Sequence, residues 1–140
     1  MTDDELIAAL ESCTLPVDQW NHRAHVRAAY LFALGRSFSS ALARVRAAIK
    51  AYNKATDTPE ALDRGYHETM THAFVWLICA AIEQSGPHAD SDAFCAAHPE
   101  LLSKSALREY YSRERIITWQ AKREFVPPDL RPLPPLTESA

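Results

Sequence analysis

Two short stretches of the sequence place histidine and glutamate where a helical protein could do chemistry. The first, NHRAHVRAAYLFAL, carries His22 and His25, and the second, GYHETMTHAFVWLICAAI, carries His67 and Glu68. A glutamate at the mouth of an apolar segment is costly to bury unless it is paired or bound to a metal. Imidazole and carboxylate groups are ligands of divalent transition metals. The two stretches therefore predict a buried His/Glu site.

The four groups can meet only if both stretches are helices that pack together. His22 and His25 are three residues apart, so they share a helix face, which continues into apolar positions such as Val26 and Ala29. Both helices are strongly apolar and carry their polar residues near the N-terminal end. We therefore expect them to contact each other. If they pack parallel or with a suitable offset, the two polar ends come together in one cluster.

A metal ion is the first interpretation of this cluster. Helix bundles build metal sites from side chains on facing helices, and a set of three ligands leaves a position for water or substrate. The expected ligands of zinc, iron or manganese are His22, His25, His67 and Glu68. Glu68 and His67 would also be the catalytic residues. If Glu68 is not a ligand, burial would raise its pKa towards neutrality and make it the general base.

The same residues also fit two interpretations without a metal. One is an acid–base site. The other is a non-catalytic interaction protein, in which the buried polar groups fix the helix register and the proline-rich tail docks on a subunit or partner. Imidazoles that converge on a cavity would favour a functional site. A Glu68 carboxylate held by an arginine, with no cavity, would favour the structural role.

The elements that must position these residues are all helical. The chain has only three glycines and lacks alternating strand patterns and hairpin turns. We predict an all-α, single-domain helical bundle of five to six helices over residues 1–126, followed by an extended proline-rich tail over residues 127–140. The expected helices cover residues 3–12, 22–34, 40–54, 66–85, 91–97 and 100–111.

Composition limits the environment and the partners. The 140 residues carry a net charge of −3, which argues against nucleic-acid binding, although the segment between Gln19 and Thr56 contains basic residues and no acidic ones. Three cysteines without a pairing pattern and an acidic N-terminus predict a cytoplasmic protein. The longest apolar run, residues 73–82, is too short to span a bilayer, so no contact with a membrane is expected. A small-molecule substrate and a homo-oligomer are both compatible with the sequence.

A second polar cluster, YYSRER, lies after the last expected helix. Tyr111 and Arg113 could close one side of the site, with the arginine binding an anionic substrate. The competing interpretation, which we favour, is a helix start capped by Ser112.

Several motifs together resemble a family of small uncharacterised bacterial proteins. The family pattern reads aromatic-x-His-x-x-His, then Tyr-His-Glu-Thr, then Tyr-Ser-x-Glu and a Pro-Asp…Pro-Leu-Pro tail. The matching residues are His22, His25, Tyr66, His67, Glu68, Thr69, Tyr111, Ser112, Glu114, Pro128, Asp129, Pro132, Leu133 and Pro134. The resemblance spans most of the chain and implies a bacterial, all-helical protein, but no particular reaction.

Overall fold

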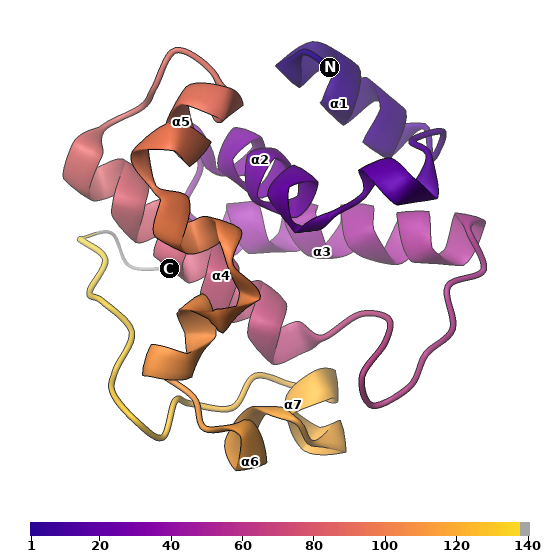
Figure 1. The fold of residues 1–140 in the computed structure, drawn as a ribbon. Helices are drawn as coiled ribbons and strands as arrows, with labels where there is room; N and C mark the ends of the chain where they lie inside the picture. Colours follow the sequence, from indigo (N-terminus) through magenta and orange to yellow (C-terminus); the bar gives the residue numbers. More distant parts are fainter. Residues whose placement is uncertain (138–140) are drawn as a thin grey trace.

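The computed structural model describes residues 1–137, which form seven α-helices and three short 3-10 helices (Figure 1). No β-strand occurs within this part of the chain, where the only ladder-type pairing joins Ala61 and Arg64. The helices are α1 (Asp3–Glu11), η1 (Val17–Gln19), α2 (His22–Ala33), α3 (Phe38–Ala55), α4 (Glu68–Ser85), α5 (Ser91–Ala97), η2 (Pro99–Leu102), η3 (Lys104–Glu109), α6 (Arg113–Ile116) and α7 (Trp119–Arg123).

Side-chain caps fix where the helices begin. Thr2 and Glu5 form a reciprocal capping box at the start of α1, and the Asn21 side chain accepts a hydrogen bond from the Ala24 N–H at the start of α2. Each cap satisfies backbone donors that the helix itself leaves without partners. Threonine and asparagine are typical N-cap residues, so both helix starts can be recognised in the sequence.

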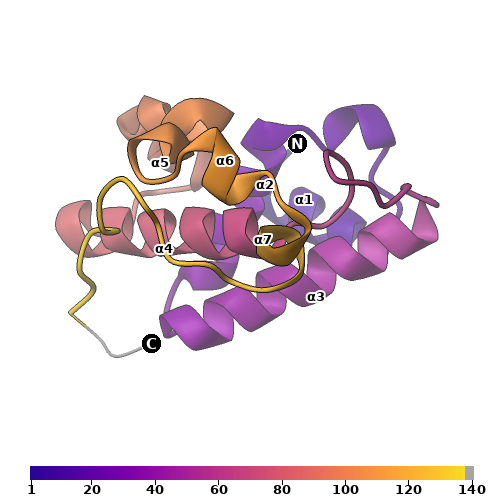
Figure 2. The same cartoon turned by 90° about the horizontal axis from the view of Figure 1, so that it is seen from below.

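Helices α2, α3 and α4 pack against one another and form the centre of the bundle, with α1 and α5 against α2. Figure 2 shows α3 and α4 side by side. Buried apolar side chains from all of these helices form one contiguous core, in which Tyr30, Ile78 and Phe94 are almost completely inaccessible to solvent. The prediction of an all-α single-domain bundle is therefore confirmed.

The basic α2–α3 region faces acidic residues at the N-terminus. Arg27 is buried, and its guanidinium donates hydrogen bonds to the Ser91 hydroxyl at 2.7 Å and to the Asp3 carboxylate at 3.2 Å. Arg44 on α3 forms a more exposed ion pair with Glu11. These contacts account for part of the charge asymmetry in the sequence. Within residues 1–137, every helix is too short or too polar to cross a bilayer.

The segment after α5 differs from the single helix expected at residues 100–111. It forms the two 3-10 helices η2 and η3, separated at Ser103, whose hydroxyl accepts a hydrogen bond from the Ser105 N–H. This bond occupies a backbone N–H that a continuous α-helix would pair with a backbone carbonyl, so it favours a break in the helix at Ser103. Helix α6 (Arg113–Ile116) then follows, with Ser112 as its N-cap, as expected.

The tail is extended and wraps around the bundle, in line with the expected polyproline-like segment. Tyr111 donates a hydrogen bond from its hydroxyl to the Val126 carbonyl at 2.6 Å, and the Trp76 indole donates to the Pro134 carbonyl. Leu133 and Leu136 pack against the core. In Figure 2 this segment runs along α4. The predicted tail also includes residues 138–140, which lie outside the described residues.

Candidate functional site

A pocket of about 680 Å³ lies where α2, α4 and the segment from η3 to α6 meet. Its volume is typical of small-molecule sites. Three of the four predicted ligands, His22, His25 and His67, line it, as do Tyr111 and Arg113, whereas Glu68 is not among the lining residues. The remaining walls are largely apolar and come from Val26, Ala29, Val45, Ile49, Met70, Phe74, Val75, Ile78, Leu107, Ile116, Ile117 and Leu130.

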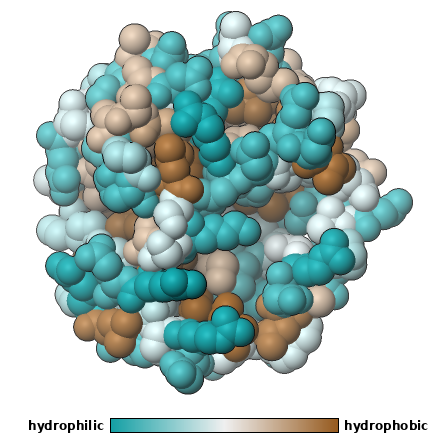
Figure 3. All heavy atoms as spheres, in the orientation of Figure 1, coloured by the Kyte–Doolittle hydropathy of each residue, from teal (hydrophilic) through white to brown (hydrophobic). Residues whose placement is uncertain are grey.

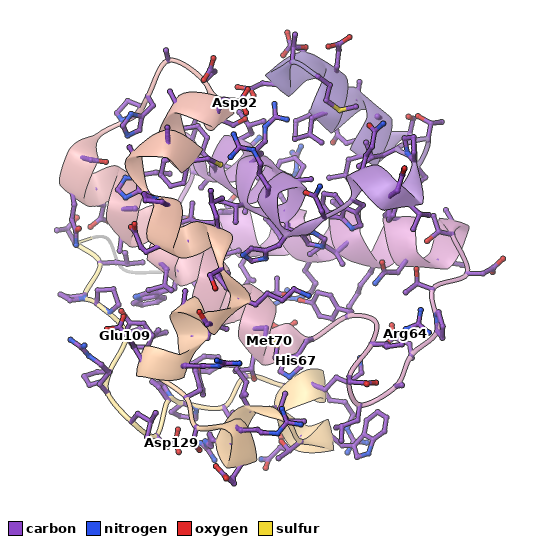
Figure 4. The ribbon with its side chains drawn as sticks, viewed as in Figure 1. Arg64, His67, Met70, Asp92, Glu109 and Asp129 are labelled. Carbon is purple, nitrogen blue, oxygen red and sulfur yellow. The ribbon has the colours of Figure 1, made fainter. Side chains whose placement is uncertain are left out.

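Figure 3 shows apolar side chains between hydrophilic ones on the face drawn in Figure 1. Figure 4 places His67 and Met70 at the N-terminal end of α4, near the segment that carries α6 and α7. The sequence therefore predicted correctly that the polar ends of α2 and α4 lie at one place, and a cavity is present there.

The first two imidazoles have fixed tautomers. His22 Nε2 lies 2.9 Å from the Leu101 carbonyl oxygen, and His25 Nδ1 lies 2.7 Å from the Asn21 carbonyl oxygen. Because a carbonyl can only accept, both of these nitrogens carry the hydrogen. His22 Nδ1 and His25 Nε2 are then the lone-pair nitrogens. Within the described residues neither of them has a hydrogen-bond partner.

Burial keeps these rings neutral. Burial, with a smaller contribution from the nearby positive charge of Lys104, lowers the pKa of His22 and lowers the pKa of His25 to about 4. The His25 ring also stacks on Trp20, with 3.8 Å between the ring centroids. Two neutral imidazoles with free acceptor nitrogens are therefore held rigidly on one wall of the pocket.

His67 has a structural role that its sequence context did not reveal. It is the N-cap of α4, and its Nδ1 accepts a hydrogen bond from the Met70 N–H at 3.1 Å. Its Nε2 donates to the Ile116 carbonyl at 2.9 Å. Both ring nitrogens are therefore occupied, which leaves no lone pair for a metal or a proton unless the helix cap opens.

Glu68 is held by an arginine that the sequence analysis did not consider as its partner. Arg46 on α3 binds the carboxylate with both sides of its guanidinium, Nε to Oε1 at 2.9 Å and a terminal nitrogen to Oε2 at 2.6 Å. The Tyr66 hydroxyl donates to Oε1 at 2.7 Å. The Glu68 side chain is 13% exposed and the Arg46 side chain 36%, so this is a partly buried, bidentate pair.

The pair also determines the protonation state of Glu68. Burial by itself would raise the pKa of Glu68, but the hydrogen bonds from Arg46 and Tyr66 outweigh it and lower the pKa. The expectation that burial raises this pKa towards neutrality is therefore wrong. A carboxylate with a lowered pKa and three donated hydrogen bonds is a poor general base at neutral pH.

The four predicted ligands do not form one ligand set. Among residues 1–137, no group of three or more His, Cys, Asp and Glu side chains is placed to hold a metal ion. The geometry instead divides the four residues by role. His22 and His25 face the pocket with free nitrogens, His67 caps a helix, and Glu68 joins α4 to α3.

The pocket carries two cations that were not predicted from the sequence, Lys104 and Arg108, beside Arg113, which was. Lys104 and Arg108 on η3 line it together with Arg113 on α6, and all three residues are exposed. Their side chains make no ion pair or hydrogen bond within the part of the chain that the structure describes. None of the described lining residues is Asp or Glu. For Lys104 and Arg108, their spacing of four residues on the helix expected at residues 100–111 was the available sequence signal.

Comparisons with known proteins give no match: no protein-family model, curated protein or solved structure matches this chain. The resemblance to a bacterial family therefore stays a prediction. Many of the residues that carry it make contacts between distant segments. The Ser112 hydroxyl donates to the Asp129 carboxylate at 2.6 Å, and the Thr69 hydroxyl donates to the Ala121 carbonyl at 2.7 Å.

Proposed function

We propose that the pocket binds a small molecule that has an apolar body and one anionic group. The observation that carries this proposal is the set of three cations, Lys104, Arg108 and Arg113, at an apolar pocket of about 680 Å³ that no described acidic side chain lines. Cations near a pocket raise the local concentration of anions and orient them on entry. Apolar walls stabilise a bound hydrocarbon or aromatic body by removing it from water.

The imidazoles define a second feature of the ligand. His22 Nδ1 and His25 Nε2 are acceptors, so they favour a ligand that offers a hydroxyl or N–H donor beside its apolar body. Binding is better supported than catalysis, because a histidine whose pKa is about 4 is a weak base at neutral pH. A cytoplasmic location fits this role, since the three cysteines have no disulfide spacing.

Calorimetric titration with decanoate, decanol and decylammonium tests the proposal. We expect decanoate to bind, decanol to bind more weakly and decylammonium not to bind, since only the first pairs with the cations. The Lys104→Gln/Arg108→Gln variant should weaken decanoate binding by about tenfold, which corresponds to about 1.4 kcal/mol. Both positions are exposed, so the fold should tolerate the substitutions.

The matched control is Arg131→Gln, which removes one exposed cation outside the pocket lining. Its decanoate affinity should equal that of the wild type. Equal affinity for decanoate and decylammonium would contradict an anion-selective pocket. Failure of decanoate, decanol and 1-naphthoate to bind at all would refute an apolar ligand site.

A divalent metal ion is a second candidate for the same pocket. His22 and His25 each donate one ring N–H to a backbone carbonyl and leave the other ring nitrogen without a partner among the described residues. Metal-ligating histidines have the same arrangement, which favours a metal ion. It is opposed by the charge of Lys104, which lies near both rings. With two protein ligands, water or substrate would have to complete the coordination sphere.

The metal candidate predicts near-stoichiometric zinc, iron or manganese in protein purified without a metal-affinity tag, measured by elemental mass spectrometry. The metal should be absent from the His22→Ala/His25→Ala variant. It should remain in the Glu68→Gln variant, because Glu68 binds Arg46 and is not a ligand. A wild type that contains no metal and takes up no added zinc would remove this candidate and leave the anion-binding proposal intact.

A further inference from the structure

A second depression, of about 610 Å³, lies on another part of the surface. The C-terminal part of α3, the loop before α4, and α7 form its walls. Figure 1 shows this loop curving beside α7. Among the described residues, Tyr66 alone lines both this depression and the pocket described above.

An aromatic ring is exposed in this depression. The Trp119 residue at the start of α7 is 50% exposed, one of few large apolar residues of the described chain with so much surface in water. An exposed indole gives a flat surface on which a planar ring can stack. Because Trp119 lines the depression and is half exposed, its indole is accessible to a ligand there.

The charges around Trp119 are strongly one-sided. Glu60 and Lys122 neutralise each other through a contact of 2.7 Å. The remaining charged residues that line the depression are the cations Lys50, Lys54 and Arg123, and all three are exposed. Lys50 lies over the Tyr66 ring, 5.0 Å from its centroid. The Lys54 side chain has no ion pair or hydrogen bond among the described residues.

The Arg123 guanidinium still has free donors. Its Nε donates to the Trp119 carbonyl at 3.2 Å, which positions the side chain and leaves the two terminal nitrogens without partners in residues 1–137. Asn53 and Thr58 add neutral polar groups to the same depression. The site thus combines three cations, small polar side chains and one exposed indole.

We propose that this depression binds a planar aromatic phosphate of the nucleoside monophosphate class. The base would stack on Trp119, and the phosphate would be bound by Lys50, Lys54 and Arg123. Arginine and lysine side chains recognise phosphate through charge and donated hydrogen bonds, and bases stack on exposed aromatic side chains. The charge and the ring must be present in the same ligand, because the cations and the indole line one cavity.

Calorimetry with AMP, adenosine and inorganic phosphate tests the proposal. We expect AMP to bind at least tenfold more tightly than either of its parts. Trp119→Ala should reduce AMP affinity by about tenfold, and Trp119→Phe should retain most of it, because a ring remains. Lys50→Gln/Lys54→Gln should cause a similar loss that shrinks at high salt.

The matched control is Arg44→Gln, which removes an exposed charge from the same helix but lies outside the depression. Its affinity for AMP should be unchanged. Circular dichroism of each variant separates lost binding from lost fold, and the charge variant tests the proposal even if Trp119→Ala is unstable. No AMP binding at millimolar concentration, or phosphate binding as tight as AMP binding, would overturn the proposal. Affinity that rises with oligonucleotide length would replace it with single-stranded nucleic-acid binding.

Discussion

Replacing Lys122 with methionine is expected to lower the free energy of unfolding by about 3 kcal/mol. The Lys122 side chain is 6% exposed, and its ammonium donates three hydrogen bonds: to the Glu60 carboxylate at 2.7 Å, to the Arg64 carbonyl at 2.8 Å and to the Tyr66 carbonyl at 2.6 Å. Methionine fills the same space but donates nothing. All three acceptors would then lose the ammonium. The Arg64 carbonyl would keep the Ala61 N–H and the exposed Glu60 carboxylate would keep the Tyr66 N–H, but the Tyr66 carbonyl would have no donor left among the described residues, and a buried acceptor without a partner is costly.

Urea denaturation followed by circular dichroism measures this effect. Lys54→Met is the control, because it makes the same substitution at an exposed position whose side chain has no hydrogen bond to the described residues, and it should change stability by less than about 0.5 kcal/mol. A loss below about 1 kcal/mol for Lys122→Met would mean that water replaces the ammonium at the three acceptors.

The Lys122 contacts hold a loop with its own backbone requirement. Gly65 has φ +85°, and a Cβ added there would meet the Glu60 carboxylate carbon at 2.4 Å. A residue with a side chain at position 65 would therefore both strain the backbone and displace the partner of Lys122. Because this loop leads directly into Tyr66 and His67, the Lys122 contacts also set one edge of the pocket.

Lowering the pH from 7 to 5 is expected to destabilise the protein by about 2 kcal/mol through His25 alone. The His25 pKa is about 4 in the native protein, whereas an unfolded histidine titrates near 6.5. Between these values the unfolded state binds more protons, so acid favours unfolding. Burial also lowers the pKa of His22, His67 and His72, and their contributions have the same sign.

Denaturation curves at pH 7, 6 and 5, in buffer that contains a chelator, measure this dependence. His25→Gln should be less stable than the wild type at pH 7 and should show a correspondingly smaller loss on acidification. His88→Gln, which changes a histidine outside the pocket, should keep the wild-type slope. A pH dependence that is the same in wild type and His25→Gln would contradict a buried, neutral His25.

The parts of the fold that were predictable from the sequence depend on local signals. Caps at Thr2 and Asn21 act over a few residues, and the apolar pattern of α4 gives its central position directly. These local signals can be recognised without knowing the tertiary contacts between segments. The contact between α2 and α4 was also expected, because they are the two most apolar helices, whereas the cavity at their N-terminal ends was not predicted.

The parts that were not predictable depend on partners distant in sequence. The Ile116 carbonyl that binds His67 is 49 residues away, and Arg46 is 22 residues from Glu68. A sequence pattern shows that a histidine or glutamate will be buried, but it does not show whether its partner is a backbone group, an arginine or a ligand. For that reason the residue types predicted a metal site, whereas the contacts assign His67 and Glu68 to the scaffold.

The wrapping of the C-terminal third around α4 has a consequence for synthesis on the ribosome. Helix α4 is covered by segments that follow it in the chain, through contacts such as Thr69 with Ala121 and Trp76 with Pro134. At about 5–20 residues per second, the roughly fifty residues after α4 take several seconds to emerge. During that interval the most apolar helix of the nascent chain is only partly covered, so apolar surface that the folded protein buries is exposed to water and to other chains.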